Sequence, residues 1–351
     1  MQVLLLGGTG AMGTHVIDFL KKKGGTEIVV TTRSARNSNE ILKYVQGNAK
    51  DINFLKELCS QHWDAILDFM VYTTAELESR IDLLLSSTDQ YIFFSSARVY
   101  ADSSDLITED SPRLLDVCTD KTYLATDEYA LAKAREENIL FSHKNKNWTI
   151  IRPSLTYGEN RLQLGVYEKE NWLYRALHGR SIVFSKDLMD RYYTLSYGKD
   201  VAEGIAALVG NKDAVGEVFH IVQDQSFQWK NILELYVAEI EKVSGKKPDV
   251  VLTEKSTNLK LENKKYQVIY GRYFNRHFDN SKIKKFVDTS NWLQPSDGLI
   301  RCLDTFLKEP VFQSIDWDVE VLLDKAAHEF SPIKDIKGKR AKLSYIKHRF
   351  I

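Results

Sequence analysis

A glycine-rich turn constrains the fold of this chain more than any other feature of its sequence. Residues 3–6 form a continuous apolar run, and three glycines follow it at a spacing of three residues, namely Gly7, Gly10 and Gly13. Apolar residues then recur with helical periodicity over residues 16–20. The first glycine permits a tight turn, the second lets a ligand approach the backbone, and the third lets helix and strand pack closely. The pattern predicts a strand, a turn and a helix whose N-terminus can bind an anion.

The alternation of strand-like and helix-like segments continues through the first half of the chain. Apolar or β-branched runs lie at residues 27–32, 43–46, 64–69, 90–95 and 148–152, and helical patterns at 53–59, 75–85 and 127–141. Such alternation predicts βαβ units and a parallel sheet covered on both faces. The six strands match the number expected for an α/β, doubly wound, dinucleotide-binding (Rossmann) sheet.

The second half of the chain is less regular. Helical patterns cover residues 170–177, 200–208 and 230–243, a strand is expected at 218–222, and 258–276 is expected to be a loop or lid. We expect a dinucleotide-binding domain at 1–165, to which elements near 192–225 return, a smaller interleaved C-terminal substrate lobe at 166–191 and 226–308, and a C-terminal extension at 309–351. The basic stretch 334–351 is expected to be a solvated tail or docking arm.

Charge and cysteine usage exclude several classes of function. Lysine plus arginine and aspartate plus glutamate number 48 each, which argues against a nucleic-acid or anionic-membrane partner and favours a small-molecule substrate. The three cysteines lack metal-ligand spacing, so no metal site is expected. The sequence shows no basic leader and no apolar run near the roughly 18 residues of a membrane span, and we therefore expect a cytoplasmic protein.

The end of the second strand indicates which dinucleotide is bound. An acidic residue there binds the ribose 2′-hydroxyl of NAD, whereas an arginine accommodates the 2′-phosphate of NADP. Here Arg33 and Arg36 follow the strand without a carboxylate, so NADP or NAD is predicted with NADP favoured, unless both arginines are solvated loop residues. Asp51 follows the third strand, where it could meet the adenine amino group or cap the next helix.

A tyrosine and a lysine form the candidate catalytic pair. Tyr129 and Lys133 stand at positions i and i+4, so both side chains emerge on one face of the predicted helix. A tyrosine with its ordinary pKa near ~10 is a poor base, but a nearby ammonium and an oxidised nicotinamide favour the phenolate. Ser96 at the carboxyl edge of the fifth strand could donate a hydrogen bond to the reacting oxygen. The spacing alone also occurs by chance in helices without a site.

With these residues in place, the chain resembles the extended short-chain dehydrogenase/reductase family, in its group of NAD(P)-dependent nucleotide-sugar epimerases, dehydratases and reductases. The matches follow the family's order over roughly residues 1–307. They comprise the glycine turn, the Tyr129 and Lys133 pair, Trp292, and residues 95–100, 152–158, 200–202, 216–221 and 279–282. The resemblance implies a nucleotide sugar between two lobes, catalytic Ser96, Tyr129 and Lys133, and a possible homodimer through the helices at 75–85 and 127–141.

The resemblance also implies a set of binding residues. The cofactor is expected at Gly7, Thr9, Gly10, Ala11, Met12, Gly13, Arg33, Asp51, Ile52, Phe69, Ser95, Tyr129, Lys133 and Pro153. The substrate is expected at Ser96, Tyr100 and Arg191. A guanidinium can clamp a diphosphate with two parallel hydrogen bonds, although Arg191 could equally be a solvated surface residue.

The residues after Ser96 favour one reaction within the group. Sugar dehydratases of this kind carry an adjacent acid and base where this chain has Ala97 and Arg98, and neither can perform elimination chemistry. The resemblance then implies an epimerase, in which Tyr129 takes the C4 hydroxyl proton while hydride passes to the nicotinamide and later returns to the other face of the keto sugar. An NADPH-dependent keto-sugar reductase is the alternative, and a non-catalytic binding or regulatory protein is a third possibility.

Three positions depart from the family's pattern. Residues 69–73 replace a His-Leu-Ala-Ala type sequence after the fourth strand, and Leu155 and His220 stand where asparagines are frequent. On the strand expected at 218–222, His220 is expected to be a core histidine with satisfied hydrogen bonds rather than a catalytic one.

Overall fold

A seven-stranded parallel sheet forms the centre of the N-terminal lobe. The computed structural model describes residues 1–259, 261 and 264–350, apart from the side chain of Ala11. The strand order is β13-β6-β5-β4-β1-β2-β3, and every neighbouring pair is parallel. The strands are β1 (Gln2–Leu6), β2 (Glu27–Thr32), β3 (Leu42–Gln46), β4 (Ala65–Asp68), β5 (Tyr91–Phe94), β6 (Trp148–Pro153) and β13 (Glu217–Ile221). The doubly wound Rossmann fold is therefore confirmed, with the strand order reversing at β1.

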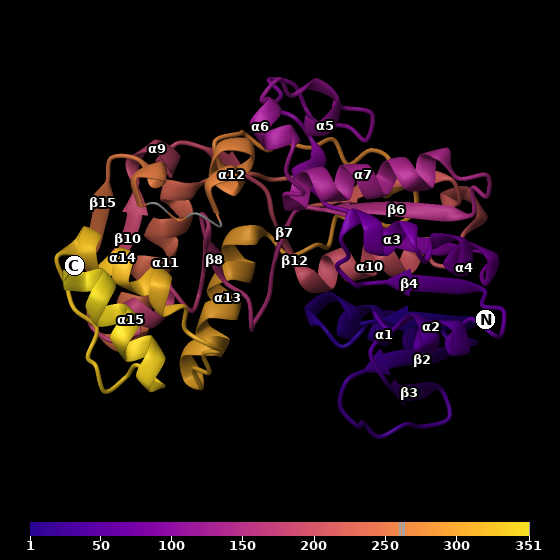
Figure 1. The fold of residues 1–351 in the computed structure, drawn as a ribbon, viewed down its shortest axis with the longest axis horizontal. Helices are drawn as coiled ribbons and strands as arrows, with labels where there is room; N and C mark the ends of the chain where they lie inside the picture. Colours follow the sequence, from indigo (N-terminus) through magenta and orange to yellow (C-terminus); the bar gives the residue numbers. More distant parts are fainter. Residues whose placement is uncertain (260, 262–263, 351) are drawn as a thin grey trace.

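Helices cover both faces of this sheet (Figure 1). Helices α1 (Ala11–Lys23) and α10 (Gly198–Leu208) pack on one face, and α2 (Ile52–Leu58), α3 (Thr74–Glu78), α4 (Ile81–Ser86) and α7 (Tyr129–Ser142) on the other. The alternation of side chains along a strand explains the division, because Val3 and Leu5 join the first core whereas Leu4 and Leu6 join the second.

The single helix expected at 75–85 is two helices, which corrects that prediction. Helix α3 ends at Glu78 and α4 begins at Ile81. Between them the Arg80 side chain donates from Nε to the Glu76 carbonyl oxygen at 2.6 Å, while the Arg80 backbone N–H turns to the Leu77 carbonyl at 3.0 Å. The side chain thus takes the acceptor that a continuous helix would have used.

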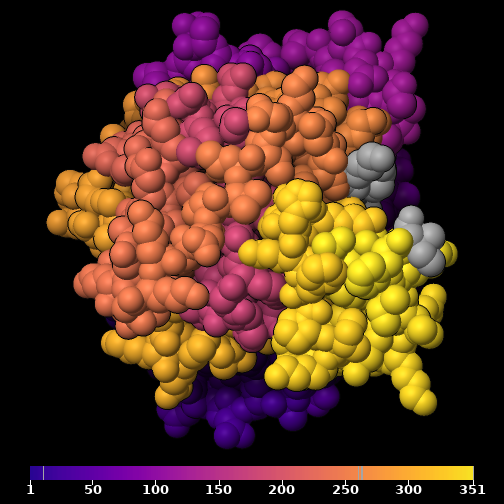
Figure 2. Space-filling view, turned by 90° about the vertical axis from the view of Figure 1, so that its left-hand side faces the viewer, coloured from indigo at the N-terminus to yellow at the C-terminus, as the bar shows by residue number. Residues whose placement is uncertain are grey.

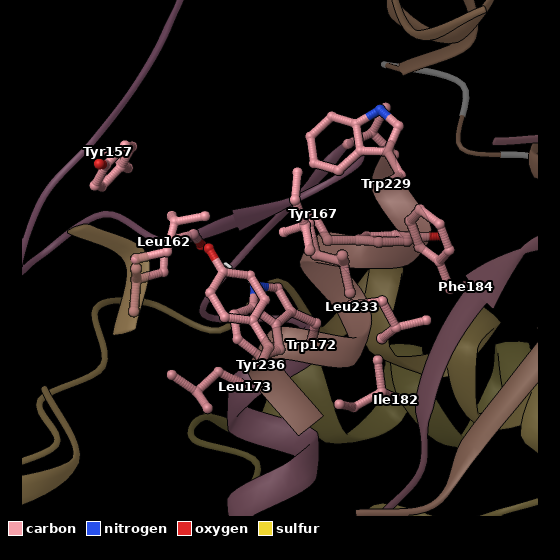
Figure 3. Close-up of a cluster of buried hydrophobic side chains, with 14 of the residues drawn as sticks. Tyr157, Leu162, Tyr167, Trp172, Leu173, Ile182, Phe184, Trp229, Leu233 and Tyr236 are labelled. Carbon is pink, nitrogen blue, oxygen red and sulfur yellow. Dashed lines mark hydrogen bonds between the residues drawn. The ribbon is translucent and has the colours of Figure 1, made fainter. Parts of the chain in front are cut away.

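A second lobe is built around one aromatic and aliphatic core (Figure 3). Four two-stranded ladders contribute, namely β7 (Leu155–Tyr157) with β12 (Leu195–Tyr197), β8 (Gln163–Leu164) with β9 (Tyr167–Glu168), β10 (Ile182–Ser185) with β15 (Val250–Thr253), and β11 (Tyr192–Tyr193) with β14 (Phe227–Gln228). The main helices are α8 (Trp172–Leu177), α9 (Lys186–Met189), α11 (Trp229–Ser244) and α13 (Pro295–Lys308). The Trp172 and Tyr236 rings stack with centroids 4.4 Å apart and join α8 to α11.

Residues expected to form a loop or lid at 258–276 contain short helices instead. A 3₁₀ turn (Ser256–Leu259), α12 (Lys265–Gln267) and a π-helix (Val268–Arg272) follow one another, and residues 260 and 262–263 lie outside the described part. The Tyr270 ring stacks on Tyr123 at 4.1 Å, which fastens this segment to the helical turns α5 (Leu114–Val117) and α6 (Lys121–Leu124). Sequence analysis did not predict these helices, because the segment has no helical periodicity and is held by contacts with residues far away in the chain.

Buried ion pairs fasten the C-terminal extension to the second lobe. Arg175 on α8 lies 2.6 Å from Asp324 and 3.2 Å from Glu320, both on α14 (Trp317–Ala327), and 2.8 Å from Glu329. Helix α15 (Lys339–Phe350) buries Tyr345 against the same cluster. Figure 2 shows this extension spread over the surface of the second lobe. Residues 334–350 of the basic stretch are therefore docked through α15 rather than a free tail, and Ile351 lies outside the described residues. Within the described residues, no helix is both long and apolar enough to cross a membrane.

We expect Arg175→Met to lower the free energy of unfolding by about 3 kcal/mol, because removing one partner leaves buried carboxylates without their counter-charge. Lys186→Met, which removes an exposed ion pair with Glu254, should cost less than about 1 kcal/mol. Urea unfolding of both variants measures the difference. An equally small loss of unfolding free energy in the two variants would show that the buried ion pairs of Arg175 do not stabilise the C-terminal extension.

Candidate active site

The glycine turn leaves the N-terminus of α1 open to a ligand. Gly7 has a φ of +71°, and its N–H donates to Thr31 Oγ1 at 2.9 Å. A Cβ on Gly13 would lie 2.4 Å from the Gly8 carbonyl oxygen, so helix and strand can approach this closely only at a glycine. A Cβ on Gly10, by contrast, would meet no described atom within 4 Å. The open side of the turn is therefore at Gly10, which caps α1.

The other expected residues of the turn lie beside it. Thr9 and Met12 are half-buried, and Met12 points toward the cavity described below. Ala11 is the first residue of α1, and its side chain lies outside the described part.

The residues expected at the adenosine end are exposed or take part in local structure. Arg33 is exposed, and its carbonyl oxygen accepts a hydrogen bond from Gln46 at 3.2 Å. The Asp51 carboxylate caps α2, accepting from the backbone N–H groups of the second and third residues after it, and Ile52 is the first residue of that helix. Of the two roles open to Asp51, this structure has the helix cap.

Two further expected cofactor residues lie at the carboxyl ends of β4 and β5. Phe69 stacks on Phe94 with ring centroids 4.2 Å apart. Ser95 is buried, and its hydroxyl donates to Glu137 Oε1 at 2.6 Å. Ser95 therefore contacts the interior of the fold, while Ser96 beside it faces the cavity.

A cavity of about 380 Å³ brings together expected residues from four parts of the chain. They are Met12 from the glycine turn, Ser96 after β5, Tyr129 at the start of α7 and Pro153 at the end of β6. The remaining lining comprises Ala97, Arg98, Glu128, Ser154, Leu155, Thr156, Arg161, Gln163, Glu168, Tyr193, Gln267 and Arg272. The cavity thus lies at the carboxyl edge of the sheet and is closed by residues of the second lobe.

The two hydroxyls of the site differ in exposure. Tyr129 is 41% exposed, whereas Ser96 is 8% exposed and accepts the Arg98 backbone N–H at 3.2 Å. Glu128 caps α7 by accepting the Ala130 N–H at 2.9 Å, which fixes the first helical turn from which Tyr129 projects. Local chain geometry therefore positions both hydroxyls.

Lys133 points into the protein rather than into the cavity. Its side chain is 2% exposed, and its Nζ lies 2.8 Å from Glu136 Oε2 and 4.6 Å from the centre of the Phe93 ring. Burial raises the pKa of Glu136, and the Lys133 ammonium opposes that rise. Sequence reasoning missed Glu136, although its position three residues after Lys133 on a helix was a usable signal.

A second ion pair lies beside Tyr129. Arg98 Nη1 is 2.7 Å from Glu128 Oε1, and the guanidinium lies 5.9 Å from the centre of the Tyr129 ring. In the described part of the chain, Nε and Nη2 of Arg98 have no hydrogen-bond partner. Sequence analysis had used Arg98 within the family match at 95–100 and as an argument against dehydration, and had not placed it among the binding residues.

Arg272 adds a buried positive charge that sequence reasoning missed. It donates from Nε to the Gly165 carbonyl at 2.8 Å and from Nη1 to the Tyr193 hydroxyl at 2.7 Å. Among residues 1–259, 261 and 264–350, it forms no ion pair. Burial lowers the pKa of Arg272, and the charges of Arg98 and Arg161 act in the same direction. The arginine was hidden in the aperiodic segment that was expected to be a loop.

Two expected substrate residues lie away from the cavity. Tyr100 is fully buried, with its hydroxyl 3.2 Å from His220 Nδ1 and the Arg152 guanidinium over its ring at 4.8 Å. Arg191 is exposed after α9, and its carbonyl oxygen accepts the Trp229 N–H at 3.2 Å. Arg98 and Arg272 line the cavity where Arg191 was expected. His220 also bonds the Asp279 carbonyl at 2.7 Å, so it is a satisfied core histidine as predicted.

Together these residues can move a proton and hold an anion. Ser96 and Tyr129 present hydroxyls, and arginines supply positive charge to the same space. Within the described residues, no group of three or more His, Cys, Asp or Glu side chains could hold a metal ion.

The comparisons with known proteins agree with this fold. The model of the NAD dependent epimerase/dehydratase family matches residues 3–221. A curated relative, the chloroplast stem-loop binding protein of 41 kDa b from Arabidopsis thaliana, is 28% identical over 239 residues, which are 63% of this chain and 58% of that protein. The chain thus matches somewhat over half the length of this relative.

Solved structures share the fold at low sequence identity. UDP-glucuronic acid 4-epimerase from Bacillus cereus, in complex with UDP-glucuronic acid and NAD, has a TM-score of 0.63 and 18% identity, with 88% of this chain and 99% of that chain covered. dTDP-glucose 4,6-dehydratase from Bacillus anthracis, in complex with NAD, has a TM-score of 0.63 and 16% identity, with 88% and 97% covered.

We expect Gly10→Ser to weaken dinucleotide binding with little change in stability, and Gly13→Ala to lower stability. The serine at position 10 meets open space and can cap α1, so the free energy of unfolding should stay within about 0.5 kcal/mol while dinucleotide affinity falls at least about tenfold. The alanine at position 13 should lower stability by about 1–3 kcal/mol, because its Cβ overlaps the Gly8 backbone. Urea unfolding and a fluorescence titration with NAD or NADP measure both effects. Full dinucleotide affinity in Gly10→Ser would contradict the assignment of the turn.

Proposed function

Because the chain belongs to the NAD dependent epimerase/dehydratase family, we propose that it is a short-chain dehydrogenase/reductase-type enzyme that epimerises a nucleotide sugar through a keto-sugar intermediate. One observation carries the proposal. The hydroxyls of Ser96 and Tyr129 share a single cavity with Met12 of the glycine turn and with Arg272. Cofactor, reacting sugar and anion sites would therefore be contiguous.

The glycine turn fits a dinucleotide. The open face at Gly10 would receive the pyrophosphate at the N-terminus of α1, and Met12 and Pro153 would flank the nicotinamide end. A nicotinamide held there would supply reversible hydride transfer. Phe69 and Ser95 support this end of the site through their contacts with Phe94 and Glu137.

The residues of α7 and β5 would carry the proton transfer. Tyr129 would accept the proton of the sugar hydroxyl at its phenolate oxygen, and Ser96 would donate a hydrogen bond to the same sugar oxygen. The phenolate needs positive charge nearby, which Lys133 supplies from within the helix and Arg98 from beside the ring. Return of the proton from Tyr129 would complete the turnover.

Arg272 supports an anionic substrate. A buried guanidinium without an ion pair is costly, and a phosphate or diphosphate is well suited to supply the missing negative charge. Arg161 lines the same cavity and pairs only loosely with Glu168, at 3.4 Å. We infer that residues 166–191 and 226–308 form the lobe that binds the nucleotide part, and that any homodimer would use α3, α4 and α7.

A keto-sugar reductase is the alternative within the same chemistry. The same Ser96 and Tyr129 would serve the reverse direction, with Tyr129 giving its proton to the keto oxygen while NADPH is consumed. The exposed Arg33 after β2, without a nearby carboxylate in the sequence, supports NADP as the cofactor.

The name of the plant relative indicates which non-catalytic function is the alternative to an enzyme. That protein is named for stem-loop binding, so binding of a nucleic-acid hairpin is the rival function. The equal numbers of acidic and basic residues argue against it, since nucleic-acid binding is driven by clustered positive charge. The exposed Tyr129 on the cavity wall favours the enzyme.

We expect Tyr129→Phe to lower turnover by a factor of about 10²–10⁴, because it removes the proton acceptor and leaves the ring in place. Incubation with UDP-glucuronic acid, dTDP-glucose and their 4-keto derivatives, followed by chromatography of the products and absorbance of the nicotinamide, gives the rate. Epimerisation leaves the cofactor unchanged after each turnover, whereas reduction consumes one NADPH per product.

The matched control is Tyr192→Phe, which changes an exposed tyrosine on β11 that does not line the cavity. It should retain full turnover. Wild-type activity in Tyr129→Phe, together with tight binding of an RNA hairpin by the wild-type protein, would replace the enzyme by a binding protein.

We expect Arg33→Ala to weaken NADP binding about tenfold or more and to leave NAD binding nearly unchanged, since only NADP carries the 2′-phosphate. Lys186→Ala is the control, because Lys186 is an exposed residue of α9 in the second lobe, and its loss should leave the affinity for both dinucleotides unchanged. Fluorescence titration with each dinucleotide measures the ratio. Equal losses for NAD and NADP would contradict the preference for NADP.

A further inference from the structure

One edge of the Arg98 guanidinium has no acceptor, although the side chain is nearly buried. The side chain is 12% exposed, and its Nη1 lies 2.7 Å from Glu128 Oε1. Nε and Nη2 are buried and have no hydrogen-bond partner among the described residues. These two groups lie on the same edge of a planar guanidinium, and a buried donor without an acceptor costs free energy. The structure therefore leaves this edge of Arg98 for a ligand to satisfy.

A glycine lies opposite the free edge. A Cβ on Gly271 would lie 3.4 Å from Arg98 Nε and 3.8 Å from Nη2. Gly271 is buried in the π-helix, and Gln267 and Arg272 of the same segment line the cavity together with Arg98. The absence of a side chain at residue 271 therefore keeps free the place in front of Nε and Nη2, and this place lies beside the cavity.

The free edge belongs to the end of the site that carries the two hydroxyls. Arg98 lies in the 3₁₀ turn (Ala97–Val99) directly after Ser96, whose Oγ accepts the Arg98 backbone N–H at 3.2 Å. The guanidinium is 5.9 Å from the centre of the Tyr129 ring. Arg272, by contrast, comes from the second lobe. Under the proposed function, Arg98 would meet the sugar near its reacting carbon, and Arg272 would meet the phosphate groups.

The chemistry of this edge favours a carboxylate. Nε and Nη2 donate in parallel, and their spacing matches the two oxygens of a carboxylate, which accepts both hydrogen bonds at once. A sugar hydroxyl is neutral and offers a single oxygen to the two donors. In a hexuronic acid the carboxylate is bonded to C5, which is next to the C4 that reacts in the proposed mechanism. An acidic sugar would therefore bring its carboxylate to the side of the reacting hydroxyl.

We propose that Arg98 is a specificity-determining residue that binds a carboxylate of the sugar through Nε and Nη2, so that the substrate class is a nucleotide-linked uronic acid. The proposal deepens the proposed function and rests on it for the place of the sugar in the cavity. Glu128 holds the other side of the guanidinium and keeps it beside the Tyr129 ring. A neutral sugar leaves the two donors without a charged acceptor and binds less tightly.

The affinities for UDP-glucuronic acid and UDP-glucose test the proposal. The two compounds differ only at C6, which is a carboxylate in the first and a hydroxymethyl group in the second. Isothermal titration calorimetry gives both dissociation constants, with the protein saturated by the reduced dinucleotide, which cannot accept a hydride from the sugar. We expect the wild-type protein to bind UDP-glucuronic acid at least about tenfold more tightly, because it gains two charge-assisted hydrogen bonds.

Arg98→Lys removes the parallel donors and keeps a positive charge beside Glu128. We expect its affinity for UDP-glucuronic acid to fall about tenfold or more, and its affinity for UDP-glucose to change less than about twofold. Arg340→Lys is the matched control, because it makes the same substitution at an exposed residue of α15 outside the cavity of Ser96 and Tyr129. It should change neither affinity.

Gly271→Ala tests the place in front of the free edge and leaves Arg98 intact. The added methyl group meets Arg98 at ordinary contact distance, so urea unfolding should show wild-type stability. It takes the volume that a ligand carboxylate would need. We expect the preference for UDP-glucuronic acid over UDP-glucose to fall about as far as in Arg98→Lys.

The outcomes separate the inference from the proposed function. Equal affinities of the wild-type protein for the two compounds, or no binding of either, would overturn the inference. An equal loss for both compounds in Arg98→Lys would also overturn it, because Arg98 would then bind the diphosphate that they share. Turnover decides the proposed function separately. Selective binding of UDP-glucuronic acid without turnover would contradict only the proposed function, and turnover without a difference in affinity would contradict only the inference.

Discussion

The burial of charged side chains between α7 and the sheet is the constraint on which the site depends. Glu137 is fully buried and accepts from Arg152 on β6 at 2.8 Å and from Ser95 after β5 at 2.6 Å. Lys133 and Glu136 pair beneath the same helix. A buried charge must keep its partner, so α7 can slide neither along β5 nor along β6 without a large loss of stability. The register that satisfies these charges also carries Tyr129 and Ser96 to the same cavity.

A network of tyrosines links Glu128, which caps α7 next to Tyr129, to the second lobe. Glu128 accepts from the Tyr123 hydroxyl at 3.0 Å, and the Tyr123 ring stacks on Tyr270 at 4.1 Å. The Tyr270 hydroxyl donates to Asp120 at 2.7 Å. Tyr270 belongs to the same short helix as Arg272, the arginine that lines the cavity. Under the proposed function, the residue that would move the proton and the residue that would hold the anion are therefore fixed to one another through these contacts.

The sequence predicted the features that local spacing controls. The glycine turn, all seven strands of the sheet including the later strand β13, and the shared helix of Tyr129 and Lys133 follow from short-range periodicity. The burial of the Lys133 side chain could not be predicted in this way. An i, i+4 spacing places two side chains on one face of a helix, but it does not say which of them is buried. Tyr100 was misplaced for a similar reason, since its partner His220 lies 120 residues away. Arg272 lay in a segment whose order comes from tertiary contacts alone.

Two ion pairs lie close to Tyr129 and differ in their access to the cavity. Arg98 and Glu128 form one pair beside the ring, and both residues line the cavity. Lys133 and Glu136 form the other pair beneath the helix, where both side chains are buried. Under the proposed function, an anionic substrate that entered the cavity would therefore meet the guanidinium of Arg98, next to the Tyr129 ring, while the pair beneath the helix would stay in place.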